Sequence, residues 1–201
     1  VIANGAGSGD PVETAVGFVN AYLSTLTPVA VLVFGAAALG DLVDDATLVY
    51  LWLRPVPARV HVLAAWAATI TITLPLVVVP MLLGTAIIHT GDGVWLAALL
   101  GALVATGAYG ALFVLAGIRF KRALPWGLVY ILIWEGFVAS AGKTASKLAL
   151  RSYVRSILAH LTDQYLKLGN RSLLASFLVP ALVAVAALAY AIRRLARTDV
   201  A

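Results

Sequence analysis

The sequence predicts an all-α fold, a bundle of membrane-spanning helices that forms one domain over residues 1–201. Two observations support this prediction. Hydrophobic residues make up 62% of the chain and charged residues only 11%, whereas soluble domains have roughly 45–50% and about 25%. The apolar residues also form continuous, non-alternating runs of about 20 residues, the length at which a helix crosses a bilayer. This composition excludes a soluble enzyme, a nucleic-acid-binding domain and a disordered tail as the main interpretation.

Five segments are long and apolar enough to be predicted as spans. They are Val12–Leu39, Val60–Ile88, Val94–Gly117, Pro125–Ala141 and Leu173–Ile192. Pro28 predicts a kink in the first of them. The chain begins with Val1 rather than Met, and its first basic residue is Arg54. We therefore expect a further membrane helix before Val1, which gives six spans in the full chain.

Basic residues in the short connections predict how the bundle is oriented. They cluster after every second span, at Arg54, Arg59, Arg119, Lys121, Arg122, Arg193, Arg194 and Arg197. Because basic loops stay in the cytoplasm, we expect Val1 outside and Ala201 inside. The net charge of +5 then favours contact with anionic lipid headgroups rather than nucleic acid. The expected location is the cytoplasmic membrane, as a multi-pass protein.

One basic segment, Gly142–Arg171, falls on the predicted outer side. Basic residues recur there every four positions, at Lys143, Lys147, Arg151 and Arg155. An apolar face accompanies them, formed by Leu150, Val154, Ile157, Leu158 and Leu161. This pattern predicts an amphipathic helix that lies in the outer membrane interface or dips into it. It is interpreted as a lid packed on the outer mouth of the bundle, as an outer gate or as a contact with lipid headgroups.

Polar residues inside the predicted spans are few. Glu135 lies in or at the edge of the fourth span, where an ionisable group is a functional candidate. It either lines a translocation path or pairs with Lys143 or Arg151. The threonines at positions 69, 71 and 73 either line a path or bond to their own backbone. Small residues every four positions, at Ala97, Gly101 and Ala105, predict a close helix-packing face in the third span.

The segment Gly40–Arg59 is predicted to contain a short cytoplasmic helix between the first two spans. Asp41, Asp44 and Asp45 provide the negative charge that favours a helix start. Residues 46–53 are strongly apolar, and Arg54-Pro55 ends the helix because proline disfavours helical geometry in the residue before it. An ordinary interfacial anchor is one interpretation of this helix.

The second interpretation comes from a resemblance. Within this segment stand Asp44 and Asp45, then Thr47-Leu48, then Arg54-Pro55-Val56, then Arg59. This pattern resembles the cytoplasmic loop of type 2 ABC exporter permeases, although Glu is more usual at the acidic positions and Gly at position 46. The resemblance implies a coupling helix that rests on an ATP-binding subunit. The coupling residues would be Asp41, Asp44, Asp45, Thr47, Leu48, Arg54, Pro55 and Arg59.

The resemblance also implies six spans, cytoplasmic termini, and short outer helices in the region of Tyr130–Leu161. Glu135, Lys143, Lys147, Arg151 and Arg155 would then belong to the pathway or outer gate. The chain would be the permease subunit of a bacterial exporter whose cargo the sequence does not identify, with an apolar lining that suits a lipidic or amphipathic substrate. Its partners would be two ATP-binding subunits, a second permease, identical or related, and membrane lipids.

The chain itself is not expected to be an enzyme, and ATP and Mg would bind to the partner subunit. Gly142-Lys143-Thr144 lacks the earlier glycine of a phosphate-binding loop, because that position is Phe137. The chain contains no cysteine and three scattered histidines, so no metal site, cofactor site or catalytic set is predicted. The alternatives are an ATP-independent scaffold subunit of a membrane complex and a secondary transporter. A membrane-embedded enzyme is a third option.

Overall fold

The computed structural model describes residues 11–45, 47, 56–88, 93–137, 145–164, 166 and 171–197. The regular structure in this part of the chain is helical throughout, so the predicted all-α bundle is confirmed. The elements are α1 (Pro11–Ala21), η1 (Tyr22–Leu26), α2 (Thr27–Asp44), α4 (Ala58–Ile88), α5 (Val94–Arg119), α6 (Ala123–Val129), η2 (Tyr130–Phe137), η4 (Ala145–Leu148), α7 (Leu150–Thr162) and α8 (Leu173–Ala196).

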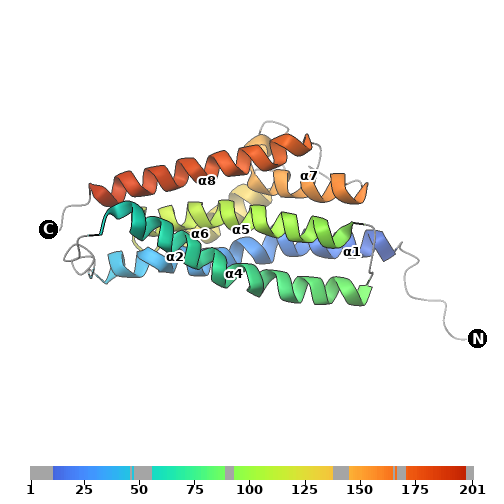
Figure 1. Cartoon of the computed structure of the whole chain (residues 1–201), viewed down its shortest axis with the longest axis horizontal. Coiled ribbons are helices and arrows are strands. Elements are labelled where there is room, and N and C mark those ends of the chain that lie inside the picture. Colours follow the sequence, from blue (N-terminus) through green and yellow to red (C-terminus); the bar gives the residue numbers. More distant parts are fainter. Residues whose placement is uncertain are drawn as a thin grey trace, which may run out of the picture.

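Four stretches of the described chain are long and apolar enough to cross a membrane. They are Pro11–Asp44, which joins α1, η1 and α2, together with α4, α5 and α8. Figure 1 shows them running along one common direction. The fourth predicted span, Pro125–Ala141, is described as far as Phe137, with seven residues in α6 and eight in η2. At 1.5 Å per residue this helix covers roughly 22 Å, less than the hydrocarbon core of about 30 Å. A fifth span is therefore not confirmed.

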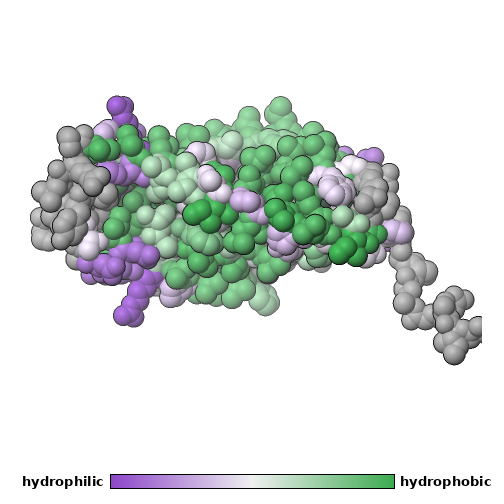
Figure 2. Space-filling model, turned by 60° about the horizontal axis from the view of Figure 1, so that its bottom comes forward, coloured by the Kyte–Doolittle hydropathy of each residue, from purple (hydrophilic) through white to green (hydrophobic). Residues whose placement is uncertain are grey.

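One end of the bundle gathers the basic residues. The end of α2, the start of α4 and the ends of α5 and α8 all lie at the left in Figure 1. Figure 2 shows hydrophilic side chains gathered near that end, whereas the middle of the molecule is mostly hydrophobic. Arg59, Arg119 and Arg194 belong to the helix turns found there. We refer to this region as the basic end; that it faces the cytoplasm stays a prediction.

Helix α5 is the centre of the bundle and contacts α2, α4, α7 and α8. The predicted small-residue face, Ala97, Gly101 and Ala105, is buried inside the chain's own bundle. Farther along α5, a Cβ on Gly117 would lie 2.5 Å from the Ala36 carbonyl oxygen of α2. Only glycine permits that approach, which brings the two backbones into direct contact.

The proline predicted to bend the first span follows a widened turn. Residues 22–26 form the π-helical turn η1, in which the Thr27 N–H donates to the Tyr22 carbonyl five residues earlier. Pro28 follows immediately and has no N–H to donate, so the regular bond to the fourth residue before it is missing. In α4, by contrast, Pro75 and Pro80 lie within one continuous helix.

The threonines of α4 bond to their own backbone. The hydroxyls of Thr69, Thr71 and Thr73 donate to carbonyls four residues earlier, at 2.8, 2.8 and 2.7 Å. Such bonds satisfy a hydroxyl within its own helix and leave no donor directed at a passing substrate. The backbone-bonding alternative for these threonines is therefore the one that the structure supports.

The predicted amphipathic helix forms, as α7. The structure has α7 packed against α5 and α8, running along the bundle toward the end opposite the basic end (Figure 1). The predicted apolar face is buried at Leu150, Val154, Ile157 and Leu158, and half-buried at Leu161. Ser152 and Ser156 are fully buried as well. The buried face is therefore wider than the apolar stripe alone, and a position of this helix in the outer membrane interface stays a prediction.

Candidate functional site

The most polar part of the bundle interior lies where η2 ends and α7 begins. Glu135, on η2, is 1% exposed. Its Oε1 accepts the Leu150 N–H at 3.1 Å, and its Oε2 accepts the Arg151 N–H, also at 3.1 Å. These two N–H groups belong to the first turn of α7, where a helix lacks internal partners for its donors. The residue before the helix, Ala149, has no polar side chain to bond them. Glu135 therefore caps α7 from another segment of the chain, with its charge near the positive end of the helix dipole.

Two tyrosines complete the surroundings of the carboxylate. The Tyr130 hydroxyl donates to Glu135 Oε1 at 3.0 Å, and the side chain of Tyr109 on α5 is buried close to Glu135. Phe113 lies between the two tyrosine rings, with centroid distances of 5.9 Å to Tyr109 and 6.4 Å to Tyr130. The aromatic rings form an apolar wall beside this polar site, while the Tyr130 hydroxyl supplies a hydrogen bond to the carboxylate.

Two arginines on α7 extend this polar region toward the first span. Arg151 Nη1 donates to the Glu135 carbonyl oxygen at 3.4 Å, and Arg155 Nε donates to the Ser24 hydroxyl of η1 at 3.3 Å. Burial lowers the pKa of Arg155 to about 10, and the like charge of Arg151 contributes to the same shift. Arg155 therefore stays protonated at neutral pH, and the two guanidinium groups interact electrostatically. We call Glu135, Arg151, Arg155 and their hydrogen-bonded partners the Glu135 centre.

Serines on α7 connect the neighbouring segments. The Ser152 hydroxyl donates to the Ser146 carbonyl at 2.7 Å, which fixes η4 against the start of α7. Arg171, just before α8, donates its backbone N–H to the Ser156 hydroxyl at 3.1 Å and Nη2 to the Ser146 hydroxyl at 2.9 Å. The Glu135 centre thus joins η1, η2 and α7, and these serine bonds link it to η4 and to the start of α8.

The sequence predicted only part of this arrangement. Of the pathway candidates, Glu135, Arg151 and Arg155 come together. The Glu135 side chain bonds to the Arg151 backbone, and the Arg151 side chain bonds to the Glu135 backbone. Lys147 is exposed on η4, and Lys143 lies outside the described residues. The tyrosines and serines were missed because single hydroxyl residues in apolar helices have no distinctive spacing. The one available signal was the four-residue spacing of Ser152 and Ser156.

At the basic end, the acidic residues lie where the first span ends. Asp41 and Asp44 belong to the last turn of α2, and Asp45 follows its end. The first span therefore continues five residues beyond the predicted Leu39. Asp41 and Asp45 are exposed. Apart from Thr47, the short helix predicted over residues 46–53 lies outside the described residues.

Asp44 has a specific partner far along the chain. Its carboxylate accepts the Arg122 N–H, at 3.1 Å to Oδ2 and 3.3 Å to Oδ1. Arg122 has a φ of +56° and directly precedes α6. Because that left-handed conformation is unfavourable for a residue with a side chain, the bond from Asp44 helps to hold the turn. Asp44 thereby connects the end of α2 to the start of α6.

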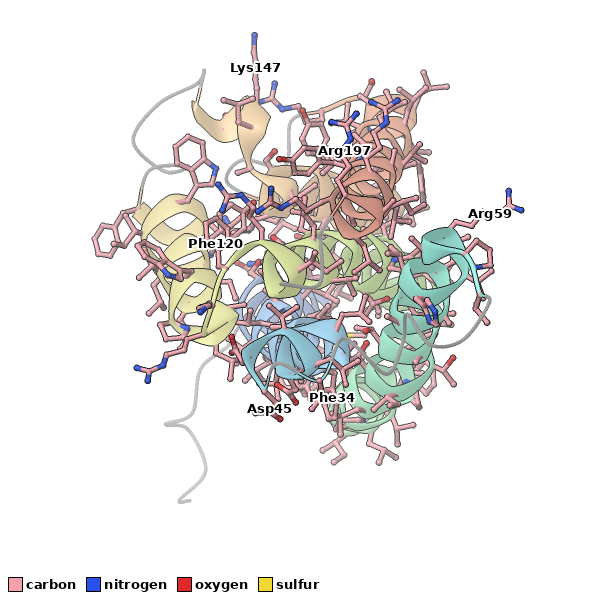
Figure 3. All side chains as sticks on the ribbon, turned by 90° about the vertical axis from the view of Figure 1, so that its left-hand side faces the viewer. Phe34, Asp45, Arg59, Phe120, Lys147 and Arg197 are labelled. Carbon is pink, nitrogen blue, oxygen red and sulfur yellow. The ribbon has the colours of Figure 1, made fainter. Side chains whose placement is uncertain are left out.

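The remaining coupling candidates do not form a cluster in the described part of the chain. Arg59 lies in the first turn of α4, and Figure 3 shows it pointing away from Asp45. The Thr47 hydroxyl donates to the Leu42 carbonyl at 3.5 Å, a long bond within its own segment. Leu48, Arg54 and Pro55 lie outside the described residues. Their contact with an ATP-binding subunit stays a prediction.

A metal-ion centre is not found among the residues that the structure describes, since these residues contain no group of three or more His, Cys, Asp or Glu side chains that could hold an ion.

Comparisons of the chain with protein-family models, with curated proteins and with solved structures each find no match. The class of protein therefore follows from the structure itself. The long apolar helices and the apolar side chains that they expose define the chain as a helical membrane protein.

Proposed function

We propose that the chain is the membrane-spanning permease subunit of an ATP-driven exporter of the type 2 ABC class. The observation that carries this proposal is the position of the segment Gly40–Arg59, which bears the family-like motif. It connects two candidate spans, α2 and α4, at the basic end of the bundle. A loop at that end, if cytoplasmic, is available to a soluble ATP-binding subunit.

The hydrogen bonds described above suggest how a movement of this loop would reach the far half of the bundle. Asp44 bonds to the N–H of Arg122 before α6, so a displacement of the end of α2 would also act on α6. Helix α6 continues into η2, where Glu135 holds the start of α7. The path is covalent or hydrogen-bonded at each step, which supports a coupling role.

In this proposal, two permease subunits, identical or related, form the pathway, and two ATP-binding subunits dock on the basic end. Closure of the ATP-binding subunits would press on Gly40–Arg59, and the Glu135 centre would open or close the outer part of the path. ATP hydrolysis would take place on the partner subunit. The cytoplasmic membrane of a bacterium is the proposed location, and the apolar bundle suits a lipidic or amphipathic cargo.

Copurification tests the partnership directly. The full-length protein, purified in mild detergent with and without gentle cross-linking, should carry a soluble subunit with a phosphate-binding loop in near-stoichiometric amount. Mass spectrometry identifies and quantifies that subunit. A preparation that lacks any ATPase under both conditions would contradict the proposal and favour an ATP-independent scaffold subunit or a secondary transporter.

Asp45→Asn tests the coupling role within the copurified complex. Asp45 is exposed at the basic end, so its loss should leave the fold intact and weaken contact with the partner. We expect transport-coupled ATPase activity to fall about fivefold or more, the lower range of typical coupling free energies. The matched control is Glu13→Gln, which removes an exposed carboxylate near the opposite end of the same span. Equal activity in both variants would argue against a coupling role for Asp45.

A further inference from the structure

The half of the bundle opposite the basic end carries an unusual concentration of cations. Lys147, Arg151, Arg155 and Arg171 belong to η4, α7 and the residue pair before α8. Among the described residues from 130 to 173, the acidic residues are Glu135 and Asp163. Four cations and two anions give this region a net charge of +2. Membrane proteins concentrate basic residues on one side, and here the basic end already holds most of them. A second cationic region therefore calls for a separate explanation.

Of the two anions in this region, Glu135 already has hydrogen-bond partners, and Asp163 follows the end of α7. The Glu135 carboxylate accepts two backbone N–H groups and a tyrosine hydroxyl. Arg151 Nη1 bonds to a neutral carbonyl oxygen, and no partner is found in the structure for its buried Nε. Arg171 Nη2 bonds to a neutral hydroxyl. Guanidinium groups whose partners are neutral are well suited to bind a phosphate, because its oxygens match their planar set of donors.

The surface beside these cations is apolar. Lys147 points away from the bundle in Figure 3, and its neighbour Leu148 is 67% exposed. Phe137 at the end of η2 and Leu174 at the start of α8 are 79% and 76% exposed. Cationic side chains that emerge from an apolar helical surface are typical of contacts with lipid headgroups, because the ammonium group reaches the phosphate while the stem stays in the apolar layer.

We propose that the surface formed by η4, α7 and the start of α8 binds the phosphate headgroup of an anionic phospholipid, with the acyl chains against the exposed apolar side chains. Lys147 contacts the headgroup from outside, and Arg151 and Arg155 supply the guanidinium groups behind it. This site does not depend on an ATP-binding partner. A permease, a scaffold subunit and a secondary transporter would all carry it.

Native mass spectrometry of the detergent-solubilised full chain tests this site, with phosphatidylglycerol, phosphatidylcholine and inorganic phosphate as separate probes. We expect phosphatidylglycerol to bind more tightly than phosphatidylcholine, and inorganic phosphate alone not to compete. In Lys147→Gln, affinity for phosphatidylglycerol should fall about fivefold, which corresponds to about 1 kcal/mol for one basic residue near a lipid surface. The matched control is Lys121→Gln, which removes an exposed lysine at the basic end and should leave this affinity unchanged.

A second variant protects the test against a folding defect. Arg155→Lys keeps the positive charge but loses the planar donor set. Its affinity for phosphatidylglycerol should therefore decrease less than that of Lys147→Gln. The thermal stability of both variants is measured in parallel. Equal binding in Lys147→Gln and Lys121→Gln would overturn the proposal. So would equal affinity for the two phospholipids. Effective competition by inorganic phosphate would instead identify a soluble anion as the ligand and would also overturn it.

Discussion

The α2–α5 interface and the Glu135 centre are held together in different ways. Between α2 and α5, backbone meets backbone, and Gly117 lies against Ala36 and Gly40. At the Glu135 centre, one carboxylate receives three hydrogen bonds, from Leu150, Arg151 and Tyr130. The first contact depends on shape along two helices, whereas the second depends on a single side chain.

This difference indicates which part of the bundle can move. A packed interface between small residues has no single bond whose loss would release it, so α2 and α5 are suited to act as a fixed frame. The start of α7 is released when one group changes its partners, and elements that move are drawn from such low-stability regions. We therefore expect a conformational change, if the chain undergoes one, to involve η2 and α7 rather than α2 and α5.

The largest effect is expected from Glu135→Ala, which removes the cap of α7. The Leu150 and Arg151 N–H groups would lose their partner in a buried site, at about 1–3 kcal/mol for each unsatisfied group. Hydrogen–deuterium exchange with mass spectrometry should show the first turns of α7 exchanging at least about tenfold faster, the equivalent of about 1.4 kcal/mol. Exchange in α5 should change little, because its contacts with α2 do not include Glu135.

Glu135→Gln is the matched variant for this experiment. Its side chain has nearly the same shape and keeps one oxygen as an acceptor, so one α7 N–H group retains a partner. We expect an intermediate increase in exchange, again confined to α7. An equal increase in α5 and α7 for the alanine variant would show that the Glu135 centre is not a local unit, and the contrast with the α2–α5 interface would fail.

The sequence indicated the residues of the Glu135 centre better than their arrangement. Glu135 was selected because a carboxylate in an apolar run is rare, and Arg151 and Arg155 because of their four-residue spacing. Their geometry depends on the bonds that the Leu150 and Arg151 N–H groups donate to Glu135, 15 and 16 positions earlier. Counting apolar residues could not predict contacts between such distant positions.

The second prediction tests the packed interface. In Gly117→Ala, the new methyl group would meet the Ala36 carbonyl oxygen at 2.5 Å and the Gly40 nitrogen at 3.2 Å. Backbone atoms cannot turn aside as a flexible side chain can, so α2 and α5 must separate. We expect a loss of about 1–3 kcal/mol in stability, the usual range for overpacking, measured as a lower midpoint of thermal unfolding in detergent.

Gly107→Ala is the control on the same helix. A Cβ at position 107 would meet no atom within 4 Å, and alanine is the better helix former. The unfolding midpoint should therefore stay the same or rise slightly. If both variants lowered the midpoint equally, the effect would come from glycine replacement in α5 in general rather than from close contact with α2.

The fold was more predictable than the Glu135 centre for a physical reason. Bilayer thickness fixes the length of a span, so the four long candidate spans could be located from composition, with ends that differ by up to five residues. The repeat of Ala97, Gly101 and Ala105 also indicated a buried face, because small residues are what close helix packing requires. The link from Asp44 to Arg122 joins residues 78 positions apart, and no local pattern predicts such a bond.

The smallest effect is expected at the interface between α4 and α5, which combines the two kinds of contact. Trp66 of α4 packs beside α5, and its indole Nε1 donates to the Gly107 carbonyl of α5 at 2.9 Å. In Trp66→Phe most of the aromatic surface is kept while this bond is lost. We expect a loss of about 0.5–1.5 kcal/mol, the net value of one hydrogen bond, measured by thermal unfolding in the same detergent. Trp95→Phe provides the comparison, because Trp95 is 37% exposed and its replacement should change the midpoint less. A Trp66→Phe midpoint equal to that of Trp95→Phe would mean that packing alone joins α4 to α5, which would leave the Glu135 centre as the part of the bundle where hydrogen bonds determine helix position.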